Sequence, residues 1–314
     1  MKRKNNLYED LYKLENIEEA FQEICQHTKN REKVAYFKEY KCLYISRIYD
    51  LLEQRKYKVG PYNIFYIYEP KKRRVVSQKL VDKVINHLVA KHILIPSVMP
   101  CLLDTNVASR KDMGCKAGIQ FARNFHRKFS INYGTYYILK VDIHNFFGSI
   151  NHDILKEKLV KKIKDKDALK IIFDIIDSDN IGLSIGNMTS QILAIFFLND
   201  LDYFVKETLH IKGYVRYQDD MLLFHQSKDY LKECLVKIKD FVEKEGLTLN
   251  PKTRIYKNTD NFIFLGRSKT GNYARYRTVK RKLKKRKYLY DTNKISLASY
   301  TSSLICYKYL LKKM

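Results

Sequence analysis

The sequence predicts a mixed α+β fold in which helices surround a small antiparallel sheet. Residues 7–58 carry apolar side chains three and four positions apart, which is the spacing of amphipathic helices. Tyr214 to Phe224 has the pattern of a strand, a tight turn and a second strand. Tyr136 to Ile143 is a short apolar run typical of a buried strand. Helices together with a sheet built from hairpins indicate the α+β class.

The remaining elements follow the same two patterns. We expect a helix from Leu80 that Pro96 ends, since proline lacks a backbone donor. The other expected elements are strands at 62–68 and 262–265, helices at 190–205 and 231–245, the latter closed by Gly246, and a basic, mostly helical tail after Gly271.

The composition indicates a globular protein that binds a polyanion. Of 314 residues, 45% are hydrophobic, enough to bury a core. Sixty Lys and Arg against 34 Asp and Glu give a net charge of +26. Nucleic acid is the first candidate partner and an acidic membrane surface the second. The alternative is a Lys-rich composition without functional meaning, as AT-rich genomes produce.

The cysteines and the N-terminus predict an intracellular protein. None of the six cysteines forms a C-x-x-C pair, and no Cys/His cluster has zinc spacing, so reduced thiols are expected. The N-terminus lacks the apolar stretch of a signal peptide. No segment approaches ~20 uninterrupted apolar residues. We therefore expect a cytoplasmic protein with no membrane partner.

Two adjacent carboxylates, Asp219 and Asp220, lie on the predicted turn between apolar strands. Placing like charges together is costly, and a divalent cation relieves the repulsion. Asp142 ends a second apolar strand, and hard oxygen ligands of this kind suit Mg²⁺. Two Mg²⁺ ions about 4 Å apart activate a hydroxyl and stabilise a leaving pyrophosphate. The alternative is a solvated turn, which the apolar residues on both sides disfavour.

With these aspartates, the chain resembles reverse transcriptases, whose motifs occur here in the expected order. The resemblance covers roughly residues 60 to 270. Five motifs in the expected order identify the family with high specificity, whereas any one motif alone would be weak evidence. The motifs are Val141–His152, Ile185–Gln191, Tyr217–Asp220, Leu247–Thr253 and Phe264–Gly266, with finger-like segments at Glu69–Val76 and Asp104–Arg110.

The resemblance implies a right-hand polymerase fold with fingers, an antiparallel palm sheet and a helical thumb. The expected division is an N-terminal helical extension at 1–61, fingers and palm at 62–266, and a basic thumb at 267–314. The implied activity is RNA-directed DNA synthesis with two Mg²⁺ ions, for which Mn²⁺ can substitute. The implied partners are template RNA, primer and dNTPs, in a bacterial or phage-encoded enzyme.

The family's catalytic roles transfer to matching positions. Asp142 and Asp219 would be the principal metal ligands, with the Ile143 carbonyl assisting and Asp220 completing the site. Lys252 would protonate the leaving pyrophosphate; an ordinary surface lysine is the alternative.

The family's nucleotide contacts also transfer. Arg73, with Arg74 or Lys72 nearby, would hold the triphosphate, because guanidinium pairs well with phosphate. A solvated basic turn is the alternative. Phe147 lies five residues after Asp142, where the family has the ring that collides with a 2′-hydroxyl. An ordinary core phenylalanine is the alternative.

Four further residues are expected near the nascent base pair. Ile185 would lie against it, where retroviral enzymes have Gln. Gln191 would shape the same pocket or cap the helix that starts there. Tyr217 and Gln218 would contact nucleic acid, with Gln218 at the primer end; the family usually has a smaller or apolar residue at that position.

The basic tail predicts a nucleic-acid contact. Its charges surround a predicted helix, which favours a template–primer duplex over the usual solvated face. The residues are Lys280, Arg281, Lys282, Lys284, Lys285, Arg286 and Lys287.

The Ile-Gly-x-x-x-Ser-Gln form of the 185–191 motif resembles the reverse transcriptases of diversity-generating retroelements, within the group II intron-like lineage. That branch implies error-rich cDNA and a small basic helical accessory protein. Antiphage-defence reverse transcriptases, which copy a non-coding RNA, are the second interpretation. A non-catalytic RNA-binding protein on a polymerase fold is the third, and the intact aspartates argue against it.

Overall fold

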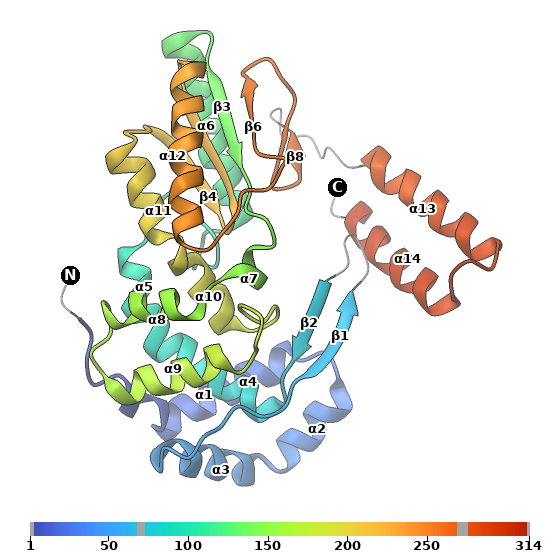
Figure 1. The fold of residues 1–314 in the computed structure, drawn as a ribbon. Helices are drawn as coiled ribbons and strands as arrows, with labels where there is room; N and C mark the ends of the chain where they lie inside the picture. Colours follow the sequence, from blue (N-terminus) through green and yellow to red (C-terminus); the bar gives the residue numbers. More distant parts are fainter. Residues whose placement is uncertain (1–2, 68–72, 269–275, 313–314) are drawn as a thin grey trace.

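A four-stranded antiparallel sheet with strand order β4-β5-β3-β6 forms the upper part of the structure in Figure 1. The computed structural model describes residues 3–67, 73–268 and 276–312. The strands are β3 (Tyr137–Val141), β4 (Gly213–Tyr217), β5 (Asp220–His225) and β6 (Arg254–Lys257). The strands predicted at 136–143 and 214–224 are confirmed.

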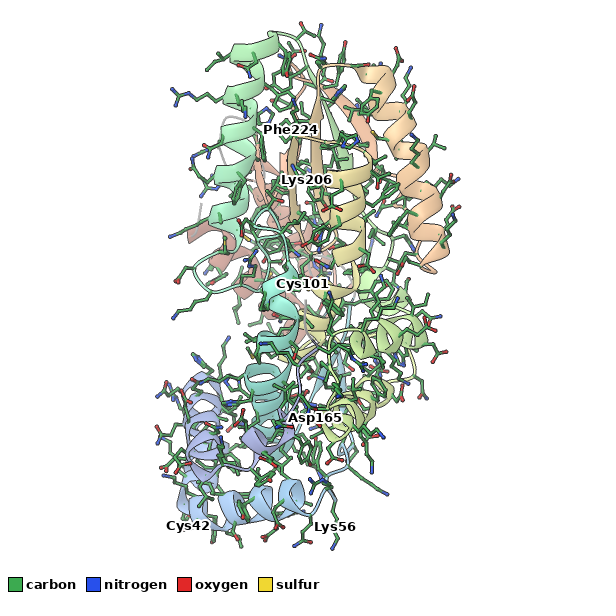
Figure 2. All side chains as sticks on the ribbon, turned by 90° about the vertical axis from the view of Figure 1, so that its left-hand side faces the viewer. Cys42, Lys56, Cys101, Asp165, Lys206 and Phe224 are labelled. Carbon is green, nitrogen blue, oxygen red and sulfur yellow. The ribbon has the colours of Figure 1, made fainter. Side chains whose placement is uncertain are left out.

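Both faces of this sheet are buried, because alternate side chains of each strand enter different cores. Ile138 of β3 and Phe224 of β5 pack against α6 (Cys115–Tyr133), with Phe224 inside the fold in Figure 2. Leu139 and Val141 enter the larger core on the other face. Helix α12 (Lys228–Lys244) covers that second face. Burial on both faces explains the nearly continuous apolar sequence of the strands.

The helices between β3 and β4 support the sheet from one end. They are α7 (Phe146–Ser149), α8 (His152–Val160), α9 (Lys166–Asp177), α10 (Met188–Phe197), α11 (Asn199–Tyr203) and the π-helical η4 (Phe204–Thr208). The apolar helix predicted from residue 190 thus begins at Met188 and is interrupted at Leu198. The prediction that Gln191 caps it is wrong, because Asn187 occupies the N-cap position and Gln191 lies in the first turn.

The N-terminal helices confirm the helical pattern of residues 7–58. They are η1 (Tyr8–Leu11), α1 (Leu14–His27), α2 (Arg31–Glu39) and α3 (Lys41–Glu53), and they share the larger core with the sheet. The rings of Phe21 and Phe37 stack with centroids 4.4 Å apart. Asp165, labelled in Figure 2, accepts hydrogen bonds from the backbone of Leu7 (2.7 Å) and Tyr8 (3.0 Å). These contacts join the N-terminal segment to the start of α9.

The prediction that Pro96 ends a helix is wrong. The segments α4 (Leu80–Leu88), η2 (Val89–Leu94), α5 (Ile95–Val98) and η3 (Met99–Cys101) continue one another. The π-helical η2 resets the hydrogen bonding, so Pro96 falls in the first turn of α5, where no donor is needed. By length and composition alone this helix, Leu80–Cys101, could cross a membrane, which the sequence did not lead us to expect. However, 61% of the most apolar stretch of this helix is buried inside the protein, as in an ordinary core helix.

Two hairpins and a helix pair complete the described chain. The hairpin of β1 (Asn63–Ile67) and β2 (Arg73–Ser77) lies below the sheet in Figure 1, above the N-terminal helices, and β7 (Ile263–Phe264) pairs with β8 (Arg267–Ser268). The basic tail forms α13 (Tyr276–Asp291) and α14 (Leu297–Lys312), which pack on each other with Tyr290 and Tyr300 stacked at 4.9 Å.

Candidate active site

The β4–β5 hairpin presents Asp219 and Asp220 at its turn. Tyr217 pairs with Asp220, so Gln218 and Asp219 form a two-residue loop. Gln218 has a φ of 55°, in the left-handed region that two-residue hairpins usually fill with glycine or asparagine. A side chain in this conformation is strained, and it persists only where neighbouring structure holds the backbone.

Arg216 holds this turn from inside the protein. Its side chain is fully buried, and its guanidinium donates to Asp202 Oδ1 (2.6 Å), to the Ile195 carbonyl (2.9 Å) and to the Gln218 carbonyl (2.9 Å). The Tyr214 hydroxyl donates to the same Asp202 oxygen at 2.6 Å. Asp202 is also fully buried, so the two charges compensate each other. The ion pair fixes the carbonyl of the strained residue and hence the position of the turn.

Asp142 lies beside this turn because of the strand register. Val141 of β3 is opposite Met221 of β5, so Asp142 and Asp220 lie one residue further along each strand and on the same face. The Asp142 carbonyl accepts a hydrogen bond from the Asn250 backbone at 2.7 Å. The segment 248–253, which contains the predicted lysine motif, thus fixes the backbone of Asp142, and Ile143 forms a bridge with Leu249.

Lys140 is a member of this cluster that sequence reasoning missed. Its ammonium lies 3.2 Å from Asp220 Oδ1 and donates to Oδ2 at 3.3 Å and to the Ile263 carbonyl at 2.8 Å. Lys140 precedes Asp142 by two positions in one strand. The period of two could therefore have identified it as a neighbour on the same face.

Burial dominates the electrostatics of the carboxylates. It raises the pKa of Asp220 to about 6; Lys140 opposes the shift, while Asp142 and Asp219 add to it. Burial also raises the pKa of Asp219, with Asp142 contributing and Arg73 and Arg216 opposing. The cluster therefore gains from any added positive charge. Within the described residues, no group of three or more His, Cys, Asp or Glu side chains is arranged as a metal cage. Asp220 is paired with Lys140.

The two arginines of β2 have different surroundings. Arg73 is exposed and lies close enough to Asp219 to lower the pKa of that carboxyl. Arg74 instead donates to the buried Asp179 at 2.6 Å, and Ser184 donates to the same carboxylate oxygen at 2.9 Å. Arg74 thus joins β2 to the loop before α10, whereas Arg73 is exposed on the opposite face of β2. Lys72 lies outside the described residues.

The loop before α10 needs glycine at two close approaches. Gly186 has a φ of +127°, and a Cβ there would lie 2.7 Å from the Val76 carbonyl. The Val76 backbone donates to the Ile185 carbonyl at 3.2 Å, which places half-buried Ile185 against β2. A Cβ on Gly182 would lie 2.1 Å from the Phe147 carbonyl. The loop therefore holds both Ile185 and Phe147 through backbone contacts.

Three predicted segments meet at Ser109. Its hydroxyl donates to Gln191 Oε1 at 3.5 Å and accepts from Gln218 Nε2 at 3.2 Å. Gln191 is therefore linked to Gln218 of the β4–β5 turn through Ser109, an intermediary that the sequence did not reveal. Tyr217 is half-buried, and burial together with Cys115 raises the pKa of its hydroxyl to about 12.

The remaining predicted site residues are Lys252 and the basic residues of the tail. Lys252 is exposed and lies two residues after Asn250, whose backbone N–H donates to the Asp142 carbonyl. The basic residues of the tail lie on α13, where Lys282 lies 5.9 Å from the centroid of the Tyr307 ring. Lys280, Arg281, Lys284, Lys285 and Lys287 are exposed there or nearly so, and Arg286 is half-buried.

A sequence profile described as "Reverse transcriptase (RNA-dependent DNA polymerase)" matches residues 56–268, which is more than half of the chain. The chain belongs to the reverse transcriptase family. This match contains the three aspartates, Arg73, Phe147 and Ile185. The α13–α14 pair and most of the N-terminal helices lie outside it.

Individual relatives within the family are distant. The chain is 27% identical over 202 residues to the retron Ec48 reverse transcriptase of Escherichia coli, covering 63% of this chain and 46% of that protein. It is 22% identical over 215 residues to the putative COX1/OXI3 intron 1 protein of Saccharomyces cerevisiae, covering 63% and 24%. The chain thus spans less than half the length of these curated relatives.

A solved structure supports the right-hand polymerase fold. The apo telomerase of Candida tropicalis, truncated from its C-terminal domain, superposes with a TM-score of 0.53 at 14% identity. The match covers 69% of this chain and 56% of that one. The predicted α+β right-hand fold is therefore confirmed, with the aspartates at the end of the antiparallel sheet as the reverse transcriptase motifs require.

The buried ion pair of this reverse transcriptase predicts a large stability effect. Asp202→Asn leaves the Arg216 guanidinium buried without its counter-charge, and we expect unfolding to require about 3–5 kcal/mol less free energy. Urea unfolding measures this. Asp229→Asn is the control, because Asp229 forms an exposed pair with Lys232 at 2.7 Å and should leave the midpoint unchanged. Equal effects of the two substitutions would contradict the assigned role.

Proposed function

We propose that the protein is an RNA-directed DNA polymerase that extends a primer by two-metal phosphoryl transfer at Asp142, Asp219 and Asp220. The observation that carries the proposal is the clustering of these carboxylates at one end of the sheet, within a reverse transcriptase domain. Charge alone would fit many RNA-binding proteins. A strained turn held over adjacent aspartates is costly, and metal-dependent catalysis is a sufficient reason to retain it.

The donor set fits Mg²⁺, with Mn²⁺ as a substitute. Carboxylate oxygens are hard ligands. Burial first, and the neighbouring carboxylates second, raise the pKa values of Asp219 and Asp220. Asp220 Oδ1 is buried and lies 3.2 Å from the Lys140 ammonium, with which it forms an ion pair. Asp142, Asp219 and the Ile143 carbonyl would hold the ions, and Asp220 would complete the site. Bound ions supply activation of the primer hydroxyl and stabilisation of the pyrophosphate.

The chain's own residues would position the substrates. Arg73 would bind the triphosphate of the incoming nucleotide, because it is exposed and its charge lowers the pKa of Asp219. The ring of Phe147 would exclude a 2′-hydroxyl and so select dNTPs. Lys252 would donate a proton to the leaving pyrophosphate. Gln218 would contact the primer end, and the basic face of α13 would contact the template–primer duplex.

The biological role we propose is synthesis of error-rich cDNA from a dedicated template RNA in a diversity-generating retroelement, with a small basic helical accessory protein. The Ile185-Gly186 pair supports it. A second candidate is an antiphage-defence enzyme that makes cDNA from a non-coding RNA. The similarity to a retron reverse transcriptase is compatible with the second role.

Metal-dependent catalysis predicts that Asp219→Asn lowers primer extension on an RNA template by about 10³-fold or more. The substitution removes the ligand charge and with it several kcal/mol of transition-state stabilisation. Extension with dNTPs and Mg²⁺ measures the rate, and a gel-shift assay should show unchanged RNA binding. Asp174→Asn, the same change at an exposed carboxylate, should extend normally. Full activity of the Asp219 variant would refute the site.

Sugar selection predicts that Phe147→Ala raises ribonucleotide incorporation relative to deoxyribonucleotide incorporation by at least about tenfold. Removing the ring relieves the collision with the 2′-hydroxyl, and a change of ~1.4 kcal/mol in discrimination suffices for this effect. The ratio of the two incorporation efficiencies is the measurement. Phe121→Ala, a half-buried phenylalanine on α6, is the control and should keep the wild-type ratio. An unchanged ratio in an active Phe147 variant would remove that residue from the gate.

Fidelity separates the two biological roles. If Ile185 replaces a polar contact to the incoming nucleotide, errors should concentrate opposite template adenine, and Ile185→Gln should lower them about tenfold. Sequencing of cDNA from a template with equal base content measures this. Ile181→Gln is the control, since Ile181 is an exposed residue of the same loop. Uniformly low error in the wild type would exclude the diversity-generating role and leave the polymerase assignment intact.

A further inference from the structure

The β7–β8 hairpin packs on the same face of the sheet as the proposed metal ligands. Phe262 and Phe264 are buried in the smaller core together with Ile138 of β3. Side chains of a strand alternate between faces, so Lys140 and Asp142 follow Ile138 on that face. Within the described residues, β7 and β8 form a two-stranded sheet of their own that shares no ladder with β3 or β6. Side-chain contacts therefore decide where this hairpin lies.

Lys140 joins the hairpin to Asp220. Its ammonium lies 3.2 Å from Asp220 Oδ1 and donates to the Ile263 carbonyl at 2.8 Å. The Lys140 side chain is 21% exposed and that of Asp220 is 23% exposed, so water screens the pair less than it screens a surface ion pair. Hydrogen bonds from a charged donor are also stronger than those between neutral groups. One ammonium thus connects β3, the β4–β5 turn and β7.

The sheet itself does not require a lysine at this position. Lys140 is opposite Leu222 of β5 and Arg254 of β6. An apolar side chain would pack against Leu222, whereas a cation opposite Arg254 destabilises the pair of strands. Arg254 lies over the ring of Tyr256, 4.6 Å from its centroid. The two acceptors of Lys140 offset the remaining cost of its charge, so its value lies in the bridge that it forms.

The turn of the hairpin is fixed separately, by packing. Leu265 and Gly266 have φ values of 50° and 79°, as in the tight turns of two-residue hairpins. A Cβ on Gly118 of α6 would lie 2.7 Å from Leu265 Cδ1, so Leu265 is in direct contact with that helix. Helix α6 thus holds the turn, and Lys140 holds the strand that lies nearest Asp220.

We propose that Lys140 is a positioning residue, which binds Asp220 and the Ile263 carbonyl together and so holds the β7–β8 hairpin where it aligns the primer end. The inference rests on the proposed polymerase function. A primer hydroxyl that reacts at Asp142 and Asp219 must pass close to whatever is bonded to Asp220, and through Lys140 that is the hairpin. Reacting atoms must approach to about 3–3.5 Å, so a small displacement of a supporting segment slows the reaction.

The first test measures the hairpin in the metal-free protein. Lys140→Met nearly keeps the length of the side chain, continues the apolar pattern of β3 and removes both bonds. Hydrogen–deuterium exchange of the amides of residues 262–268 should become about tenfold faster or more. Lys140→Arg keeps a charged donor and should retain slow exchange. Lys156→Met is the matched control, because Lys156 of α8 is 23% exposed and pairs with Asp177 at 2.7 Å; exchange at 262–268 should not change.

The second test separates positioning from stability. In single-turnover extension of a primer on an RNA template, Lys140→Met should lower the maximal rate constant about tenfold and leave the Kd for dNTP within about twofold of the wild type. Lys140→Arg should restore most of the rate constant. A variant that is only less stable would lose reaction amplitude, because fewer molecules are active, while its rate constant stayed the same. Lys156→Met should keep the wild-type rate constant.

Two results would overturn the proposal. The first is wild-type exchange of the hairpin amides in Lys140→Met, and the second is an equal decrease of the rate constant in Lys140→Met and Lys156→Met. Exchange is measured without metal, primer or nucleotide. A wild type that extends no primer would therefore refute the polymerase function, and the exchange data would still show whether Lys140 holds the hairpin.

Discussion

The buried ion pair between Asp202 and Arg216 is the interaction on which the catalytic end of this protein depends. Both side chains are fully buried, so each charge requires the other. Through Arg216 the pair connects α11, the last turn of α10 and the carbonyl of Gln218. The strained Gln218 conformation is thereby maintained, and with it the position of Asp219. A polar network placed inside the core thus determines where the reactive carboxylate lies.

Sheet register supplies the second constraint. Antiparallel pairing of β3 with β5 brings Asp142 and Asp220 to the same face. Lys140, two residues before Asp142, lies diagonally across from Asp220 and forms an ion pair with it. The lysine partly neutralises a cluster whose burial otherwise disfavours its charged form. A divalent cation and Lys140 would therefore act on the same carboxylate.

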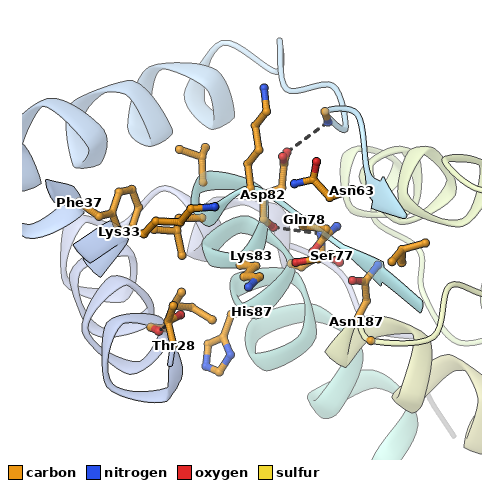
Figure 3. Close-up of a pocket in the computed structure, with 18 of the residues that line it drawn as sticks. Thr28, Lys33, Phe37, Asn63, Ser77, Gln78, Asp82, Lys83, His87 and Asn187 are labelled. Atoms are coloured by element: carbon orange, nitrogen blue, oxygen red, sulfur yellow. Dashed lines mark hydrogen bonds between the residues drawn. The ribbon is translucent and has the colours of Figure 1, made fainter. Parts of the chain in front are cut away.

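The hairpin β1–β2 is fixed to the loop before α10 and borders a cavity of about 1340 Å³ against the N-terminal helices (Figure 3). Its backbone is joined to the Ile185 carbonyl through Val76, and Arg74 joins it to the loop through Asp179. These bonds come from Arg74 and Val76, whereas Arg73 lies on the other face of β2 and lowers the pKa of Asp219. The N-terminal helices, which share the larger core, form the opposite wall of the cavity. One hairpin thus borders both the catalytic end and the cavity.

The sequence by itself determined the α+β class and the principal strands, and it singled out the three aspartates as candidate metal ligands, because apolar periodicity and ordered motifs are local properties. It also indicated a polyanion partner through the net charge of +26. The continuation of the helix through Pro96 depends on a π-helical turn that no local pattern predicts. Only the tertiary structure decided three further features: the different surroundings of Arg73 and Arg74, the choice of Asp202 as the partner of Arg216, and the hydrogen bonds of Ser109 with Gln191 and Gln218. Each depends on residues distant in sequence, brought together by packing and strand pairing.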